Sequence, residues 1–195
     1  IENIKEPNTD ILDQVYDSDA QFKLSIELCS ILGLKDEQFR LDISEHPFTS
    51  RVAGNDLRLT TRINKHDIKE SIWSTIHEAG HGLYELNLKQ EEAFLPSGEA
   101  SSLSVHESQS RFYENLIGKS RTFVHAIWNK LVDYFPNELN EYSAEDFHKA
   151  INKVEPGFIR TSADELTYML HIIIRYEIEK EMISSVMKVK ELPDL

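Results

Sequence analysis

The chain has 195 residues, of which 40% are hydrophobic and 28% are charged, a composition typical of a globular protein rather than a disordered segment. Its net charge of −13 comes from 34 acidic against 21 basic residues, and no cluster of lysine and arginine occurs, which argues against binding to nucleic acid. The apolar runs are too short to span a bilayer, so we expect no membrane-embedded segment.

A single cysteine, Cys29, rules out an internal disulfide bond and fits a reducing compartment, so a cytoplasmic location is predicted. The chain begins at Ile1 rather than at a methionine, and we expect a segment of a longer protein. We expect residues 1–195 to form a single but incomplete domain, because the length suits one domain.

The first third of the chain contains one predicted helix and two predicted strands. Apolar residues recur at helical spacing over residues 17–33, and Gly33 is suited to end that helix. Apolar and polar residues alternate over residues 40–43 and 56–63, as expected for strands. Turn-forming residues lie between these two predicted strands.

The rest of the chain is predicted to be helical. The expected helices span residues 67–88, 99–116, 120–135, a short segment capped by Ser143 and Asp146, and residues 162–187. The predicted fold class is therefore mainly α, with a small antiparallel β-sheet packed against the helix at 67–88.

The most specific pattern is His77-Glu78-Ala79-Gly80-His81, an HExxH motif within the predicted helix at 67–88. Residues four apart lie on one face of a helix, so the two imidazoles can bind one metal ion. The glutamate between them is placed to act as a general base on water. This pattern predicts a zinc hydrolase with His77 and His81 as ligands and Glu78 as catalytic base; the alternative is two structural histidines.

A catalytic zinc site needs a third protein ligand, and Glu107 on the next predicted helix is our candidate. The break at Pro96-Ser97-Gly98 lets that helix fold back beside the first one. The alternative for Glu107 is an exposed surface acid.

Glycine at position 80 weakens a helix relative to alanine by about 1 kcal/mol, which suggests a steric requirement there.

Five ordered motifs across residues 46–168 resemble the thermostable zinc carboxypeptidases named after the Thermus aquaticus enzyme. They are His46-Pro47-Phe48, Asp56-Leu57-Arg58-Leu59-Thr60 (DxRxT), the HExxH motif, His106-Glu107-Ser108-Gln109, and the IRxxADELTY segment from Ile159 to Tyr168.

The resemblance implies a zincin-like, mostly helical metallopeptidase that removes single residues from peptide C-termini. It implies broad specificity with C-terminal proline disfavoured, zinc or cobalt at His77, His81 and Glu107, and a homodimer. It also implies that Arg160 binds the terminal carboxylate of the substrate, which suits the bidentate geometry of a guanidinium. The alternative for Arg160 is a salt bridge to Glu155 or Asp164.

Several further residues are candidates for a supporting role, each with a structural alternative. His46 lies near the site or caps a turn, and His106 is placed to orient a ligand. Tyr168 is a hydrogen-bond donor to an oxyanion or a packed ring. Three further candidates are structural supports or substrate contacts: Asp56, Arg58 and Thr60. Asp164 is a supporting residue of the site or an acid that favours the dipole at the start of the last helix.

The family's last motif, GxxQDxHW, and its N-terminal helices do not occur in this sequence. We therefore expect the segment alone to be weakly active or inactive. Two alternative functions are another metallopeptidase, such as an oligopeptidase or an aminopeptidase, and an inactive helical fragment with a structural role. Arg160 argues against an aminopeptidase, because such an enzyme needs acids to bind the substrate's amine.

Overall fold

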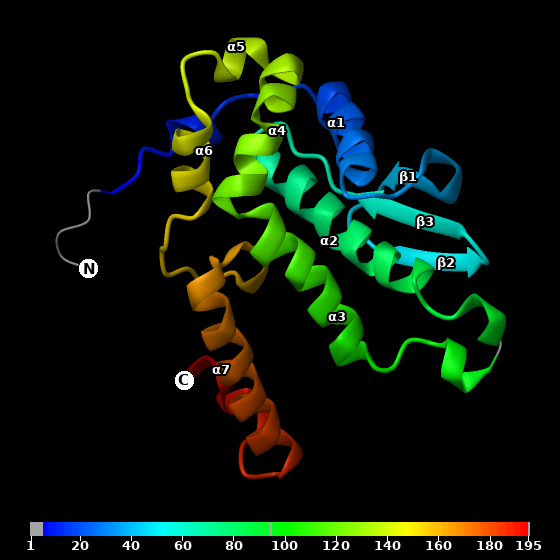
Figure 1. Ribbon diagram of the computed structural model, residues 1–195. Coiled ribbons are helices and arrows are strands. Elements are labelled where there is room, and N and C mark those ends of the chain that lie inside the picture. The colour runs from blue at the N-terminus through cyan, green and yellow to red at the C-terminus, as the bar shows by residue number, and fades with distance from the viewer. Residues whose placement is uncertain (1–5, 94, 195) are drawn as a thin grey trace. The chain divides into compact units, whose positions relative to one another are not determined.

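A computed structural model describes residues 6–93 and 95–194 of the chain. The chain divides into two compact units, one ending at Ile151 and the other spanning Asn152–Leu195, and each is described here by itself. The architecture is mainly helical with one small sheet, as predicted (Figure 1). The prediction of a single incomplete domain stays a prediction.

The first unit contains a three-stranded sheet in the order β1-β3-β2. Its strands are β1 (Phe39–Ile43), β2 (Thr49–Ala53) and β3 (Asp56–Thr61). β3 pairs parallel with β1 and antiparallel with β2, so the prediction of a purely antiparallel sheet is wrong.

The cause of this difference is β2, which the sequence pattern did not predict. β2 reverses the chain direction, and the tight turn at Gly54 (φ 50°) reverses it again, so β3 runs in the same direction as β1 and lies between the other two strands. The left-handed conformation of Gly54 is one that glycine adopts without steric cost.

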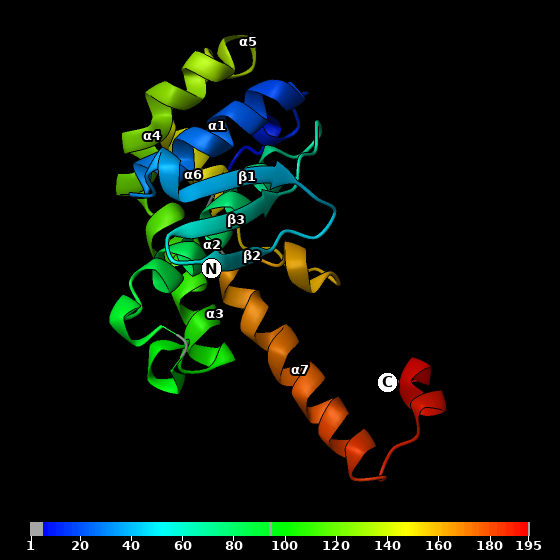
Figure 2. The same cartoon turned by 90° about the vertical axis from the view of Figure 1, so that its right-hand side faces the viewer.

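Helix α2 (Ile68–Leu86) lies at the centre of the first unit, and its limits agree with the predicted helix at 67–88. Asp67 caps its start by accepting a hydrogen bond from the amide of Lys69. In Figure 2 the sheet faces the viewer and α2 runs behind it. α1 (Ser18–Ile31), capped by Asp17, packs against α2.

Helix α3 (Leu103–Arg111) follows α2 and lies beside it (Figure 1). It begins four residues later than predicted because Ser102 provides the cap, accepting from the amide of Val105. The chain then continues into a π-helical segment, Phe112–Gly118. Beyond it lie α4 (Arg121–Tyr134), α5 (Pro136–Leu139) and α6 (Ala144–Ile151).

Local capping explains where two of these helices begin. Ser120 accepts a hydrogen bond from the amide of Phe123 at the start of α4. Ser143 and Asp146 bond reciprocally before α6, at 2.9 Å from the Ser143 amide and 3.2 Å from the Asp146 amide, which confirms the predicted capping pair. Four short 3-10 turns complete this unit: Asp10–Leu12, Asp36–Gln38, Gln90–Glu92 and Pro96–Gly98.

The core of the first unit has two parts, and α2 contributes to both. One side of α2 contributes its buried isoleucines to a core cluster shared with α1, α4 and α6. The other side places Ala79 against Leu57 and Leu59 of β3, together with Cys29 of α1. Cys29 is fully buried, and burial raises the pKa of its thiol to about 12, so it acts as a packing residue.

The second unit consists mainly of α7 (Glu165–Ile183), with short turns at Arg160–Ser162 and Val189–Asp194. The helix predicted at 162–187 is present but shorter. Asp164 caps it by accepting from the amides of Leu166 and Thr167. Among the described residues, no helix is both long enough and apolar enough to cross a membrane.

Candidate metal centre

The HExxH motif occupies the middle of α2, where His77 and His81 lie one helical turn apart. Their rings meet edge to face with centroids 4.8 Å apart. The two side chains are 17% and 15% exposed, so they lie at the edge of the core with limited access to solvent.

Glu107 of α3 reaches both histidines. Its Oε2 atom lies 3.6 Å from Nε2 of His77 and 3.5 Å from Nε2 of His81. One ligand atom from each of the three residues lies within 4.8 Å of the others. Two ligands at about 2.0–2.1 Å from a tetrahedral ion are about 3.3 Å apart, so this donor set fits one metal ion.

The charge at this site also suits a cation. Burial lowers the pKa of His77, but its hydrogen bonds to Glu107 and Glu114 outweigh burial and raise the pKa to about 9. The same contacts from His77 and His81 hold the pKa of Glu107 well below its usual range. The carboxylates therefore stabilise positive charge between α2 and α3.

Glu78 points away from α3, toward the sheet on the other side of α2. Its side chain is buried, with 7% of the residue exposed. The hydroxyl of Thr49 on β2 lies 2.7 Å from Oε2 of Glu78 and 2.9 Å from the Glu78 carbonyl oxygen. This contact limits the rotation of the carboxylate that follows the first histidine.

Each histidine has a second partner at its other ring nitrogen. Nδ1 of His77 lies 2.8 Å from Oε2 of Glu114, in the π-helical segment. Nδ1 of His81 lies 2.6 Å from Nδ1 of His106, whose Nε2 lies 2.8 Å from Oε1 of Glu85. Both rings therefore turn their Nε2 atoms toward Glu107.

The close approach of α3 to α2 depends on Gly80. A Cβ atom at this position would lie 2.9 Å from Cα of Ser110, closer than real Cβ contacts allow. Ser110 itself is fully buried. The steric requirement predicted from the glycine in the motif is therefore present, and it brings Glu107 within reach of the histidines.

Comparison with known proteins gives the family of this chain. The profile described as "Carboxypeptidase Taq (M32) metallopeptidase" matches residues 1–195. The chain belongs to this family. It is 42% identical over 190 residues to thermostable carboxypeptidase 1 of Thermus thermophilus and 40% identical over 190 residues to carboxypeptidase 1 of Bacillus subtilis.

These alignments include 97% of this chain but only 37% and 38% of the two relatives, so the chain spans less than two fifths of their length. The crystal structure of the M32 carboxypeptidase from Deinococcus radiodurans superposes with a TM-score of 0.93 at 39% identity, over 97% of this chain and 38% of that one. Membership in a metallopeptidase family implies a bound metal ion.

Other candidates in the first unit of this M32 chain lie apart from the metal cluster. His46 is exposed in the turn between β1 and β2, and only its carbonyl has a described partner, the hydroxyl of Ser44 at 2.8 Å. Asp56 and Arg58 form an exposed ion pair of 2.8 Å with each other. Thr60 is buried, and its hydroxyl oxygen accepts from the Phe48 amide, which supports the turn.

The C-terminal candidates lie in the second unit. The Arg160 guanidinium donates to the hydroxyl of Tyr168 at 2.7 Å and lies 5.7 Å from the centre of that ring. Among the described residues, neither Glu155 nor Asp164 forms an ion pair with Arg160; Glu155 pairs with Lys153 at 2.8 Å. Asp164 serves as the cap of α7.

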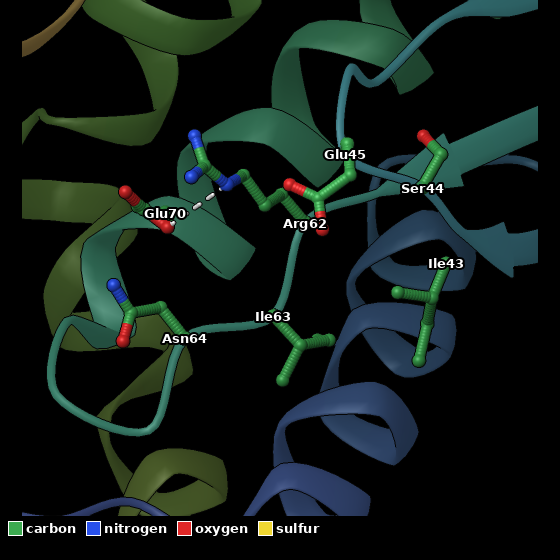
Figure 3. Close-up of a pocket in the computed structure, with 7 residues that line it drawn as sticks. All are labelled: Ile43, Ser44, Glu45, Arg62, Ile63, Asn64 and Glu70. Atoms are coloured by element: carbon green, nitrogen blue, oxygen red, sulfur yellow. Dashed lines mark ion pairs between the residues drawn. The ribbon is translucent and has the colours of Figure 1, made fainter.

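A shallow, open pocket of about 350 Å³ lies where the parallel strands β1 and β3 end (Figure 3). Arg62 and Glu70 form an ion pair of 3.4 Å on its wall. Neither Glu107 nor the histidines of α2 line it, so this pocket is separate from the candidate metal centre.

Sequence reasoning missed three residues of the centre: Thr49, Glu85 and Glu114. The one available signal was spacing, since Glu85 is four residues after His81 and Glu114 is seven after Glu107, both helical intervals. Thr49 carried no such signal, because it comes from the strand that was not predicted.

Proposed function

We propose that the intact protein containing this chain is a metallocarboxypeptidase, which hydrolyses the C-terminal peptide bond of peptides. The observation that carries the proposal is the convergence of His77, His81 and Glu107 beside the buried Glu78, in a chain of the M32 family. Zinc is the proposed metal, with cobalt as a functional substitute, because two imidazoles and one carboxylate form a typical catalytic zinc set.

The proposed roles follow from the position of each side chain. His77, His81 and Glu107 hold the ion, which when bound supplies Lewis acidity toward water and the substrate carbonyl. Glu78 takes a proton from the attacking water and passes it to the nitrogen of the leaving amino acid. Thr49 holds the Glu78 carboxylate in place through the contact at 2.7 Å.

Arg160 is proposed to bind the free C-terminal carboxylate of the substrate. The resemblance supports this role, as does the absence of a described acidic partner for its guanidinium. By the same resemblance we propose broad specificity with C-terminal proline disfavoured and a homodimer. The single cysteine supports the proposal that the protein acts in the cytoplasm. The segment by itself is expected to have weak activity or none.

The metal is tested first. The intact protein is expected to hold about one zinc ion per chain, measured by elemental analysis, and His77→Ala should lose it. His125→Ala is a suitable control, since His125 is an exposed residue of α4 outside the cluster. A purified protein that stays metal-free after incubation with zinc contradicts the proposal.

Substrate recognition is tested separately with an N-acylated Ala-Arg dipeptide. The intact protein should release arginine, and Arg160→Ala should lose most of this activity while keeping its zinc. The same peptide with an amidated C-terminus should be a poor substrate, because it lacks the carboxylate. Equal cleavage of the two peptides would exclude a carboxypeptidase and favour another type of metallopeptidase.

A further inference from the structure

We propose that Glu114 and His106 are positioning residues, which hold the two histidines of α2 in the one tautomer that presents Nε2 to a metal ion. The inference rests on the proposed function, because it deepens the role of the same site. A neutral imidazole binds a metal only through the ring nitrogen that carries no proton, so the partner of the other nitrogen decides which one is available.

The partner of His77 is a carboxylate. Oε2 of Glu114 lies 2.8 Å from Nδ1, and an ionised carboxylate only accepts hydrogen bonds, so Nδ1 carries the proton and donates it. Nε2 of His77, on the side of Glu107, is then left with its lone pair. Glu114 is mostly buried, with a side chain 13% exposed, which strengthens this contact.

Arg111 contacts both Glu114 and Glu107, the candidate metal ligand on α3. Its Nη1 lies 3.0 Å from Oε2 of Glu114 and its Nε lies 3.0 Å from Oε1 of Glu107. One guanidinium therefore joins the carboxylate that faces the metal site to the carboxylate that orients His77. Glu114 lies in the π-helical segment, a type of turn that often marks functional sites.

The partner of His81 is a second imidazole, that of His106. The contacts of His106 decide which nitrogen of each ring carries the proton. Nδ1 of His81 and Nδ1 of His106 are 2.6 Å apart, so for neutral rings one of them donates and the other accepts. Nε2 of His106 lies 2.8 Å from Oε1 of Glu85, which accepts only.

The proton of His106 is therefore on Nε2, its Nδ1 accepts, and Nδ1 of His81 is the donor. Nε2 of His81 is left free for a metal, as in His77. Glu85 is held in turn by Arg51, which lies 3.8 Å from its carboxylate and donates to its backbone carbonyl at 2.9 Å. Two separate chains of contacts thus select the same nitrogen in both ligands.

The test measures the zinc affinity of the intact protein, by competition with a chelator, for the wild type and two variants. Glu114→Met removes the hydrogen-bond acceptor at His77, and His106→Phe keeps an aromatic ring beside Tyr84 but removes the acceptor for His81. Each is expected to weaken zinc binding by about 10- to 100-fold with one ion still bound at saturation. The visible absorption spectrum of bound Co²⁺ should change as well.

Two further variants separate positioning from a general effect on folding. Glu27→Gln alters a carboxylate that pairs with Lys130 at 2.8 Å, outside the cluster, and should leave zinc affinity unchanged. His106→Asn restores an acceptor, and zinc affinity should recover at least in part. If Glu114→Met does not fold without metal, the comparison of His106→Phe with His106→Asn decides between the two explanations.

Wild-type zinc binding with unchanged affinity in the Glu114→Met and His106→Phe variants would overturn the positioning role and leave the proposed function standing. A wild-type protein that binds no zinc would overturn both. Equal loss of affinity in His106→Phe and His106→Asn would also overturn the role of His106, because the acceptor would then be irrelevant.

Discussion

At the scale of single residues, the candidate metal centre contains three side chains that would bind the ion and one, Glu78, that would transfer protons. Glu78 lies between the two histidines in sequence but faces the sheet, in contact with Thr49. Its carboxylate is thus excluded from the cluster formed with Glu107. A group placed in this way affects proton transfer without contributing to metal affinity.

Glu78→Gln should therefore lower kcat by about 10²- to 10⁴-fold, because general acid–base catalysis contributes that much. Glutamine has nearly the same shape and still accepts from Thr49, so the fold should be kept. Steady-state kinetics with a blocked dipeptide and zinc analysis of the same sample check this prediction. Retention of most activity, or loss of the zinc, would contradict the role assigned to Glu78.

Helix spacing predicted the two histidines of α2, and a motif on another helix predicted Glu107. The HExxH spacing places His77 and His81 on one face by geometry, and the motif at 106–109 pointed to Glu107. Glu114 and Thr49 were out of reach because their partners belong to other elements. Their roles depend on how α3 and β2 pack against α2, which no local pattern encodes.

At the scale of elements, the close contact between α2 and α3 sets the width of the metal site. Gly80 allows this contact, since a Cβ would meet the backbone of Ser110 at 2.9 Å. Gly82, two residues after Gly80, faces the sheet, where a Cβ would meet the ends of side chains, Cδ1 of Leu57 at 2.9 Å and Cδ2 of Leu59 at 3.5 Å. A side-chain end can rotate away, whereas the backbone of a packed helix cannot.

Gly80→Ala should therefore destabilise the protein by about 1–3 kcal/mol through overpacking, offset in part by about 1 kcal/mol of helix propensity. Zinc affinity should fall too, because α3 carries Glu107. Gly82→Ala gains the same propensity with a smaller steric cost and is the matched control. Urea unfolding and zinc titration of both variants check this; equal behaviour of the two would contradict it.

The helix limits were predictable where a cap was visible, as at Asp67, Ser120 and Ser143. The sheet was not, because pairing depends on the path of the chain between strands. Once β2 occupies residues 49–53, β3 returns parallel to β1, and alternation of apolar residues cannot distinguish the two directions. The π-helical segment after Arg111 had no recognisable sequence signal either.

The cap of α7 allows a prediction about pH. Burial raises the pKa of Asp164, but hydrogen bonds from Thr167, Glu155 and Leu166 outweigh it, so the pKa lies below its ordinary value of 3.8. A lowered folded-state pKa means that the stabilisation is complete above pH 3.8 and disappears as the pH falls through the folded value.

Asp164→Ala should remove about 1 kcal/mol from the start of α7, which corresponds to about fivefold faster amide exchange. Hydrogen–deuterium exchange of the peptide containing Leu166 and Thr167 measures this at neutral pH. In strongly acidic buffer the variant and the wild type should converge. A difference that persists in acid would show that the carboxylate charge is not responsible.

At the scale of the whole molecule, the proposed metal ligands come from two helices that are separated in sequence by the segment at 87–102. The unfolded chain holds these ligands apart, so the ion binds the folded state preferentially. Family membership was predictable from five ordered motifs in the sequence, and the profile match confirms it. The domain organisation stays a prediction, because this chain spans less than two fifths of its relatives.

Zinc should consequently raise the thermal stability of the intact protein in proportion to the logarithm of its concentration. A free zinc concentration of 100 times Kd is expected to add about 2.7 kcal/mol to the free energy of unfolding. His77→Ala should unfold at a temperature independent of zinc, while His125→Ala should keep the full shift, since His125 lies outside the cluster. A zinc-dependent shift of equal size in His77→Ala would place the ion elsewhere, because a site left with only His81 and Glu107 has lost one of its three ligands and binds zinc more weakly.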